Sequence, residues 1–329
     1  SDIENVLFVH LTYLLYYPIT DELKTKPTQN AIRELQQLGI TPDILVCRSE
    51  HPVPPEIKEK LSLYTNLSVS HIIDASNDDS IYTVPLSFIK ENVHLILKDK
   101  LNLSGELNSK KWVSLNNKIK SLTESTTIGI LGKYTDLNDS YKSLLESISH
   151  AGLRWNRKIK IEWLSASQNV HSKLNTLQGL VIPGGFGEGG VESMLEIIEL
   201  ARRNKLPTLG ICFGMQLMVI EFFRNCLGIK GAGSAEFENC SPNVITKMKQ
   251  WESSSYGGTM RLGNCSVQLS EHSKIKDIYG QTTITERHRH RYDVNSKEPL
   301  LEEMENLGLR ITGKCSNHGL IEVVEMNDT

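Results

Sequence analysis

Short apolar runs that alternate with amphipathic helical stretches restrict the fold of this chain more than any other feature of its sequence. In the first hundred residues the apolar runs are 4–17, 43–47 and 71–74, and helical patterns occupy 28–39 and 56–64 between them. Strands that alternate with helices are typical of a parallel sheet that carries helices on its faces. We therefore expect an α/β fold, in which residues 4–17 form a buried strand that runs into a loop.

The first helical pattern has recognisable signals at both of its ends. Thr28 is a residue type that caps helix N-termini, and Gly39 suits the left-handed position just after a helix. Ala31, Leu35 and Leu38 recur at helical spacing, which predicts that they share one apolar face.

A second series of the same kind begins at residue 126, so the fold class that we predict is α/β with two doubly wound, Rossmann-like domains. Its strand-like runs are 126–132, 158–164, 177–185 and 206–211, and its helical patterns are 140–152 and 194–203. After Lys230 the sequence changes to alternating segments that suit antiparallel strands.

The segment between the two series, residues 101–125, is rich in Ser, Asn and Lys and has a helical pattern only at 112–122. We interpret it as a linker between a first domain at 1–100 and a second at 126–329. An ordinary surface helix within one continuous domain is the alternative.

Charge and composition exclude several classes of protein. The formal net charge is −3, which gives no basic field for nucleic acid, and no apolar run approaches the ~20 residues of a membrane span. The Arg287–His290 cluster, RHRH, lies among polar segments and is interpreted as structural or substrate-positioning. Six cysteines without a CxxC spacing indicate reduced thiols, so we expect a cytoplasmic protein without a metal site.

The stretch LPTLGICFGMQLMVIEFF, residues 206–223, predicts a reactive cysteine. Cys212 stands between Gly210 and Gly214, where an apolar strand turns into a helix, and this is the spacing of a nucleophile elbow. The N-terminus of the following helix is expected to favour the thiolate. A buried core cysteine is the alternative interpretation.

A glycine-rich turn lies one strand earlier. Pro183–Gly187, PGGFG, follows a predicted strand, and sites of open α/β sheets gather at the carboxyl ends of strands. Its backbone amides, with that of Phe213, are candidates to hold the negative charge of an acyl-transfer intermediate.

These two motifs together resemble the class I glutamine amidotransferases, in which cysteine attacks the side-chain amide of glutamine and ammonia is released. Further segments occur in the order expected of the CTP synthase family: KTKPTQ, PDILVCRS, DSIYTVP, GKYTDLNDSYKS, SAEF, GGTMRLG and ERHRHRYDVN. The resemblance implies an ATP-dependent amidoligase domain joined to a glutaminase domain, which together convert UTP to CTP.

The resemblance also implies site residues. It makes Cys212 the nucleophile and implies that glutamine is bound by Gly185, Phe213, Gly214, Met215, Gln216, Glu236 and Arg291. An arginine suits the carboxylate of glutamine, and an acid suits its ammonium group.

For the first domain the resemblance implies a nucleotide site. UTP and CTP would be bound by Lys24, Thr25, Lys26, Pro27, Thr28, Gln29 and Lys60, and ATP would be contacted by Asp78. Lysines at the start of a helix suit phosphate, although a solvated helix start is the alternative. Gly189 and the pair Ser76 and Asn77 depart from the residues usual in the family.

The expected partners and cofactors follow from the family. They are UTP, ATP with Mg²⁺ and glutamine, with CTP as feedback inhibitor and GTP as activator, and no bound organic cofactor. Assembly into a homotetramer and filaments is also implied, without nucleic acid or membrane.

Two family motifs do not occur in the sequence. None of the ten histidines is followed by Pro-Glu, and there is no G-x-x-x-x-G-K-[ST] phosphate loop, to which Gly132-Lys133-Tyr134 is a poor match. We therefore expect the chain to be incomplete at both ends and inactive alone. The alternatives are a short non-catalytic paralogue, which binds nucleotide or assembles with the full enzyme, and a stand-alone glutaminase.

Overall fold

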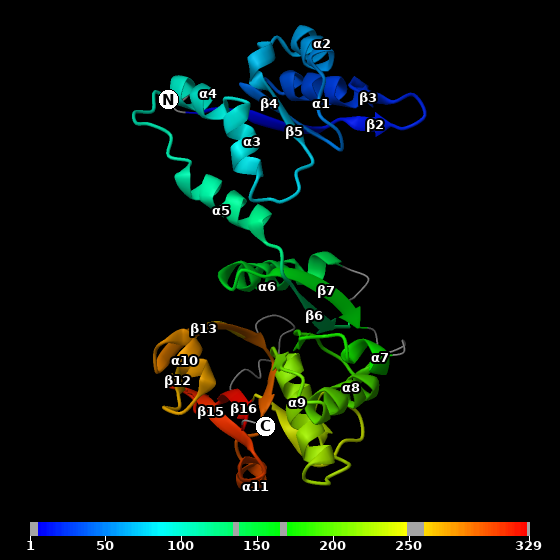
Figure 1. The fold of residues 1–329 in the computed structure, drawn as a ribbon, viewed down its shortest axis with the longest axis vertical. Coiled ribbons are helices and arrows are strands. Elements are labelled where there is room, and N and C mark those ends of the chain that lie inside the picture. Colours follow the sequence, from blue (N-terminus) through cyan, green and yellow to red (C-terminus); the bar gives the residue numbers. More distant parts are fainter. Residues whose placement is uncertain (1–5, 134–137, 165–169, 249–259, 328–329) are drawn as a thin grey trace. The chain divides into compact units, whose positions relative to one another are not determined.

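The computed structural model describes residues 6–133, 138–164, 170–248 and 260–327, and the chain divides into two compact units, Ser1–Leu122 and Thr123–Thr329. Figure 1 shows the elements of each unit. Parts of two motifs used above, residues 134–137 and 257–259, lie outside the described residues.

The first unit is built on a parallel sheet of strand order β1-β4-β5. These strands are Val9–Tyr13, Ile44–Ser49 and Ile72–Ser76. Its helices are α1 (Lys26–Gln37), α2 (Pro55–Thr65), α3 (Val84–Lys90), α4 (Val93–Lys100) and α5 (Lys110–Ser121), with a 3₁₀ turn at Val69–His71.

Each face of this sheet has its own apolar core. Successive side chains of a strand point to opposite faces, so they pack alternately into one core and the other. On one face Leu45 and Cys47 of β4 pack with Ile32 of α1 and Leu61 of α2. On the other face Ile44 and Val46 pack with Ile96 of α4. A sheet covered by helices on both faces confirms the α/β prediction for this unit.

The expectation of a buried strand at 4–17 is wrong. β1 is the edge strand of its sheet, and Val9, Leu11 and Tyr13 are exposed. The chain then forms a hairpin of β2 (Leu15–Tyr17) and β3 (Glu22–Lys24). Apolar composition predicted the strand, but burial depends on which neighbours cover it.

The first helix begins earlier than its capping signal predicted. Thr25 is the N-cap residue, and Pro27 stands in the first turn, where proline's fixed φ suits a helix start. Thr28 is buried and its hydroxyl lies 2.9 Å from that of Thr12. At the other end Gly39 adopts φ 79°, as predicted, but Leu38 is 77% exposed, contrary to the expected apolar face.

The helix α5 lies within the predicted linker. Asn116 is buried and donates hydrogen bonds to the carbonyl oxygens of Tyr82 (2.7 Å) and Trp112 (3.0 Å), while its own amide oxygen accepts from Thr83. These contacts attach α5 to the first unit. The division into 1–100, a linker and 126–329 stays a prediction.

The second unit contains a parallel sheet of order β7-β6-β8-β9. Its strands are β6 (Ser125–Leu131), β7 (Lys158–Leu164), β8 (Gly179–Ile182) and β9 (Thr208–Gly210). The helices that alternate with them are α6 (Lys142–Arg154), α7 (Val170–Leu174), α8 (Val191–Arg203) and α9 (Phe213–Asn225), and Asn138–Tyr141 form a 3₁₀ turn. The predicted series of strands and helices is confirmed.

Antiparallel pairing follows, as the alternating segments predicted. One antiparallel sheet has the order β13-β12-β15-β16. A smaller, mixed sheet has the order β10-β11-β14, in which β10 pairs with β11 in parallel and β11 pairs with β14 antiparallel. The strands are β10 (Gly233–Ser234), β11 (Asn243–Lys247), β12 (Arg261–Leu269), β13 (Thr283–His290), β14 (Tyr292–Val294), β15 (Leu309–Cys315) and β16 (Ile321–Met326), with helices α10 (Lys274–Tyr279) and α11 (Leu301–Asn306).

The core of the second unit is centred on α9. Phe213, Leu217, Ile220 and Phe223 of this helix are almost completely buried in one continuous apolar cluster. Because α9 starts at the predicted reactive cysteine, this largely buried helix anchors the site. No helix in the described ranges has the length and apolarity to span a bilayer.

Candidate active site

The turn from β9 into α9 has the geometry of a nucleophile elbow. Cys212 is the N-cap residue of α9, with φ 54° and ψ −108°. A positive φ is strained for a residue with a side chain, and such strain persists where surrounding packing holds it. The parallel pairing of β8 with β9 and the burial of α9 provide that packing.

Glycines on both sides of Cys212 allow the backbone to approach closely. A side chain at Gly214 would overlap the carbonyl oxygen of Ile182, the last residue of β8. A Cβ at Gly210 would lie 2.6 Å from Met218 Sδ. These positions explain why the elbow carries a glycine at each of them.

The glycine-rich turn after β8 lies beside the elbow. A Cβ built on Gly184 would lie 3.8 Å from Cys212 Cβ, and one on Gly185 would lie 3.4 Å from the Phe213 ring. The backbone N–H of Gly187 donates to Glu236 Oε1 at 2.9 Å. The structure therefore brings Gly185, Cys212, Phe213 and Glu236 together, although they come from three separate segments.

Burial dominates the electrostatics of the nucleophile. It raises the pKa of the Cys212 thiol, and the nearby carboxylates of Asp293 and Glu236 raise it further. The Phe213 N–H, at the start of α9, lowers this pKa. The N–H at the start of α9 therefore favours the thiolate, as expected, but desolvation has the larger effect on this pKa.

A lysine braces the glycine-rich turn. Lys133, just after β6, donates from Nζ to the carbonyl oxygen of Phe186 (3.1 Å) and to that of Gly187. The same Nζ lies 4.6 Å from the centre of the Phe213 ring. Burial lowers the pKa of Lys133, while Glu236 and Glu188 act in the opposite direction.

Three further residues predicted to bind glutamine lie in α9 or next to β14. Gln216 is buried and donates from Nε2 to the carbonyl oxygen of Tyr292 at 2.9 Å, which links α9 to β14. Arg291, next to Tyr292, is exposed, and its carbonyl oxygen accepts from Met248. Met215 is half-buried against the core. Gln216 thus ties β14 to the helix that begins at the elbow.

A buried polar cluster contacts β14, the strand Tyr292–Val294. Arg261 Nη1 pairs with Glu322 Oε1 at 2.5 Å and lies 3.5 Å from His290 Nε2, while His290 Nδ1 lies 2.9 Å from the Tyr292 carbonyl oxygen. Cys265, His288 and Asp293 complete two groups of metal-binding side-chain types. Since the Arg261 guanidinium already supplies positive charge among these atoms, we assign no metal ion to them.

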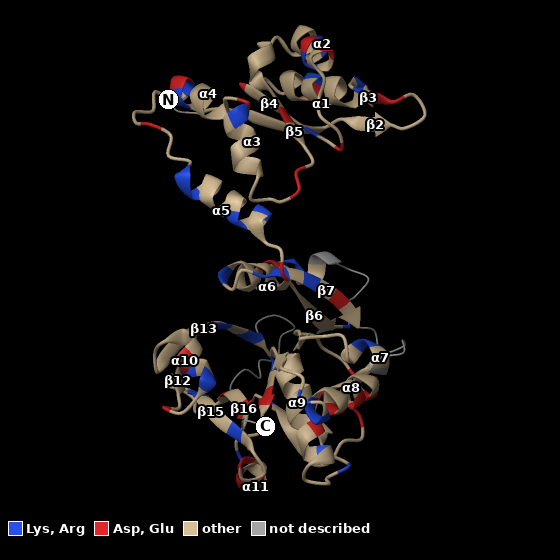
Figure 2. Cartoon of the chain, viewed as in Figure 1, with Lys and Arg blue, Asp and Glu red and all other residues tan. Residues whose placement is uncertain are grey.

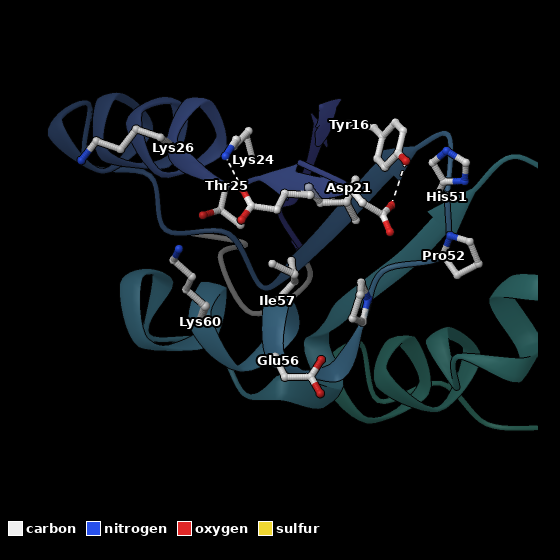
Figure 3. Close-up of a pocket in the computed structure, with 13 residues that line it drawn as sticks. Tyr16, Asp21, Lys24, Thr25, Lys26, His51, Pro52, Glu56, Ile57 and Lys60 are labelled. Atoms are coloured by element: carbon white, nitrogen blue, oxygen red, sulfur yellow. Dashed lines mark hydrogen bonds and ion pairs between the residues drawn. The ribbon is translucent and has the colours of Figure 1, made fainter. Parts of the chain in front are cut away.

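The first unit contains a cavity of about 660 Å³ (Figure 3). It lies between the β2–β3 hairpin, the start of α1 and the start of α2. Lys24, Thr25, Lys26 and Lys60 line it, and Lys60 extends from α2 toward the side where Lys24 and Thr25 lie. Four of the predicted nucleotide residues thus surround one space.

The other predicted nucleotide residues lie elsewhere. Gln29 is buried and donates to Thr25 Oγ1 at 3.1 Å, so it and Thr28 support the helix start from inside. Pro27 is in the first turn of α1 and does not line the cavity. Asp78, in the loop after β5, accepts a hydrogen bond from Ser87 at 2.8 Å and is exposed.

Sequence reasoning missed several residues that the structure adds to these sites. In the sequence, Lys133 stands out only as part of a poor match to a phosphate loop. Tyr16 and His51 also line the cavity, with ring centres 4.2 Å apart. Tyr16 lies in β2 and His51 in the β4–α2 connection, so only the fold brings them together.

Two sequence-family models match the chain. The one described as "Glutamine amidotransferase class-I" matches residues 136–329, more than half of the chain. The one described as "CTP synthase N-terminus" matches residues 1–103.

Relatives named CTP synthase match almost the entire chain. The protein from Mycoplasma mycoides subsp. mycoides SC is 41% identical over 329 residues, which cover 98% of this chain and 62% of the relative. The protein from Hydrogenobaculum sp. is also 41% identical, over 99% of this chain and 61% of the relative. This chain thus spans about three fifths of the length of these relatives.

A solved structure gives the same assignment for the second unit. The glutaminase domain of Trypanosoma brucei CTPS with bound acivicin matches 61% of this chain and 81% of its own, with a TM-score of 0.56 and 31% identity. Elbow, glycine turn and fold together define the class: the chain belongs to the class I glutamine amidotransferases. Within that class it is a member of the CTP synthase family.

Proposed function

We propose that the second unit binds glutamine and that Cys212 attacks its side-chain amide. The observation that carries this proposal is the strained elbow at Cys212, with the Gly184 and Gly185 turn against it and Glu236 hydrogen-bonded to that turn. Attack forms a bond from sulfur to the amide carbon, and the carbonyl oxygen becomes an anion. The amides of the turn and of Phe213 stabilise this anion.

We propose that the first unit binds UTP, and the product CTP, in the cavity lined by Lys24, Thr25, Lys26 and Lys60. The N-terminus of α1 opens at this cavity, and helix N-termini together with lysines favour phosphate. Asp78 would contact ATP, which the family is expected to use together with Mg²⁺. The ammonia from glutamine would then convert UTP to CTP in the whole protein.

The reaction of the whole protein needs groups that these 329 residues do not contain. The sequence has neither a His-Pro-Glu segment to supply a general base nor a phosphate loop. We therefore expect this chain by itself to form no CTP from UTP, ATP and ammonia. Regulation by CTP and GTP, a homotetramer and a cytoplasmic location are part of the same proposal.

Covalent labelling tests the glutamine site without requiring turnover. Acivicin, the ligand of the Trypanosoma brucei structure, is an amino acid with an electrophilic ring. Mass spectrometry should find it on Cys212, glutamine should slow the labelling, and asparagine should not. Labelling that is spread over the six cysteines, or that is unaffected by glutamine, would refute a glutamine site and favour a non-catalytic chain.

A further inference from the structure

The peptide unit that joins Phe186 to Gly187 is held at both of its polar ends. Its carbonyl oxygen accepts from Lys133 Nζ at 3.1 Å, and its N–H donates to Glu236 Oε1 at 2.9 Å. In a trans peptide these two groups point in opposite directions, so a cation on one side and a carboxylate on the other determine its rotation.

Lys133 makes further contacts to the same turn. Its Nζ also donates to the carbonyl oxygen of Gly187, and the ammonium lies 4.6 Å from the ring centre of Phe213, the residue that follows the nucleophile. A Cβ on Gly185 would lie 3.8 Å from Lys133 Cδ. One side chain thus contacts the glycine turn and the first residue of α9.

The sheet order explains how Lys133 reaches both segments. In the order β7-β6-β8-β9, β6 is adjacent to β8, and β8 is adjacent to β9. Lys133 follows β6, the glycine turn follows β8, and Cys212 follows β9. Since these strands are parallel, their carboxyl ends meet at one edge.

We propose that Lys133 is a positioning residue that sets the orientation of the glycine turn against Cys212, and so aligns its amides with the anion that forms on attack. This inference rests on the proposed glutamine reaction. Lys133 acts through the turn and does not itself touch the reacting atoms. The rate depends strongly on this alignment, because a displacement of about 1 Å in such a site lowers the rate on the order of 100-fold.

The test compares two reagents on the whole chain. In acivicin, the Cys212 sulfur adds to the ring carbon, negative charge develops on the ring nitrogen, and chloride then leaves as the C–Cl bond breaks. Iodoacetamide alkylates the same sulfur by direct displacement of iodide and develops no charge that the turn would stabilise.

Lys133→Met should slow acivicin labelling at saturation by about tenfold or more, with the iodoacetamide rate and the Tm unchanged. Lys133→Arg, which keeps charged donors, should restore part of the rate.

A matched control is Lys276→Met, which removes a partly buried lysine paired with Glu271 in the same unit. It should label at the wild-type rate. Equal acivicin rates in wild type and Lys133→Met would overturn the positioning role alone. An equal loss of rate with acivicin and with iodoacetamide would also overturn it, because such a loss indicates a general role of Lys133 in folding. Absence of acivicin labelling in the wild-type chain overturns the glutamine site and the positioning role together.

Discussion

At the scale of single residues, backbone geometry distinguishes Cys212 from the other five cysteines. Of the six cysteines, Cys47, Cys265 and Cys315 are buried, whereas Cys212 combines partial exposure with a positive φ at a strand-to-helix turn. Burial nevertheless raises the pKa of its thiol. The turn therefore presents the sulfur, and a base or a bound substrate must favour its ionisation.

Gly214 is the residue whose replacement should be most damaging to the elbow. An alanine there would overlap the Ile182 carbonyl oxygen, and relief requires a shift of β8 or α9. We expect Gly214→Ala to lower the free energy of unfolding by about 1–3 kcal/mol or more and to reduce Cys212 labelling. Urea unfolding measures the first effect. Gly189→Ala, where no atom lies within 4 Å, is the control and should be neutral.

Asp293 should make stability depend on pH. Burial and the neighbouring Glu322 raise the pKa of its carboxyl to about 8, with Arg261 and the Val294 N–H acting in the opposite direction. The folded chain therefore retains a proton that the unfolded chain releases above its ordinary pKa. The free energy of unfolding consequently falls as pH rises toward 8, by about 1.4 kcal/mol per pH unit at most.

Asp293→Asn removes this ionisation but keeps an oxygen for the Val294 N–H. Its free energy of unfolding relative to wild type should increase between pH 5 and pH 8, as measured by urea unfolding at each pH. His288 and His290, whose pKa values are lowered by burial, remain in both proteins and cancel in the comparison. A constant difference across this range, equal to that of the exposed control Asp277→Asn, would contradict the assignment.

At the scale of elements, the β2–β3 hairpin and the two helix starts create the charged cavity. Lys24 is paired with Glu22, which lowers the pKa of that carboxyl, whereas Lys60 comes from α2. Figure 2 shows that basic and acidic residues both occur around the hairpin. The proposed phosphate binding here would depend on three lysines, Lys24, Lys26 and Lys60, brought together by separate elements.

Lys60→Met should weaken CTP binding to the chain by about tenfold or more, since a lost contact to a charged group costs about 1.5–3 kcal/mol. Titration calorimetry at two salt concentrations checks this, and the affinity of the wild type should fall as salt rises. Lys100→Met is the control, because Lys100 pairs with Asp43 outside the cavity. An equal effect of both variants would show only a loss of net charge.

At the scale of the whole molecule, the chain consists of two units that have separate cores. The clusters around Leu45 and around Ile44 belong to the first unit, and the large cluster around α9 belongs to the second. We expect calorimetry to resolve two unfolding transitions, with CTP raising one Tm and covalent acivicin raising the other. A single transition that both ligands shift would contradict independent units.

The sequence alone indicated the order of most elements and predicted Cys212 as the nucleophile. Local periodicity predicts the strands of both parallel sheets and the helices α1, α2, α6, α8 and α9 near their places, but not α3, α4, α7 or the β2–β3 hairpin. A glycine-flanked cysteine between a strand and a helix has few other interpretations. The motif order also predicted the family, which the comparisons confirm. Each of these features depends on residues that are neighbours in the sequence, so no long-range information is needed to find it.

Only the tertiary structure decided which residues are buried and which separate segments meet. It exposed one side of β1, moved the start of α1 to Lys26 and turned Thr28 and Gln29 inward. It also brought Lys133 to the glycine turn, 53 residues away from Phe186 in sequence. The physical reason is that burial, desolvation and side-chain contacts depend on strand order in the sheet, which no local pattern encodes.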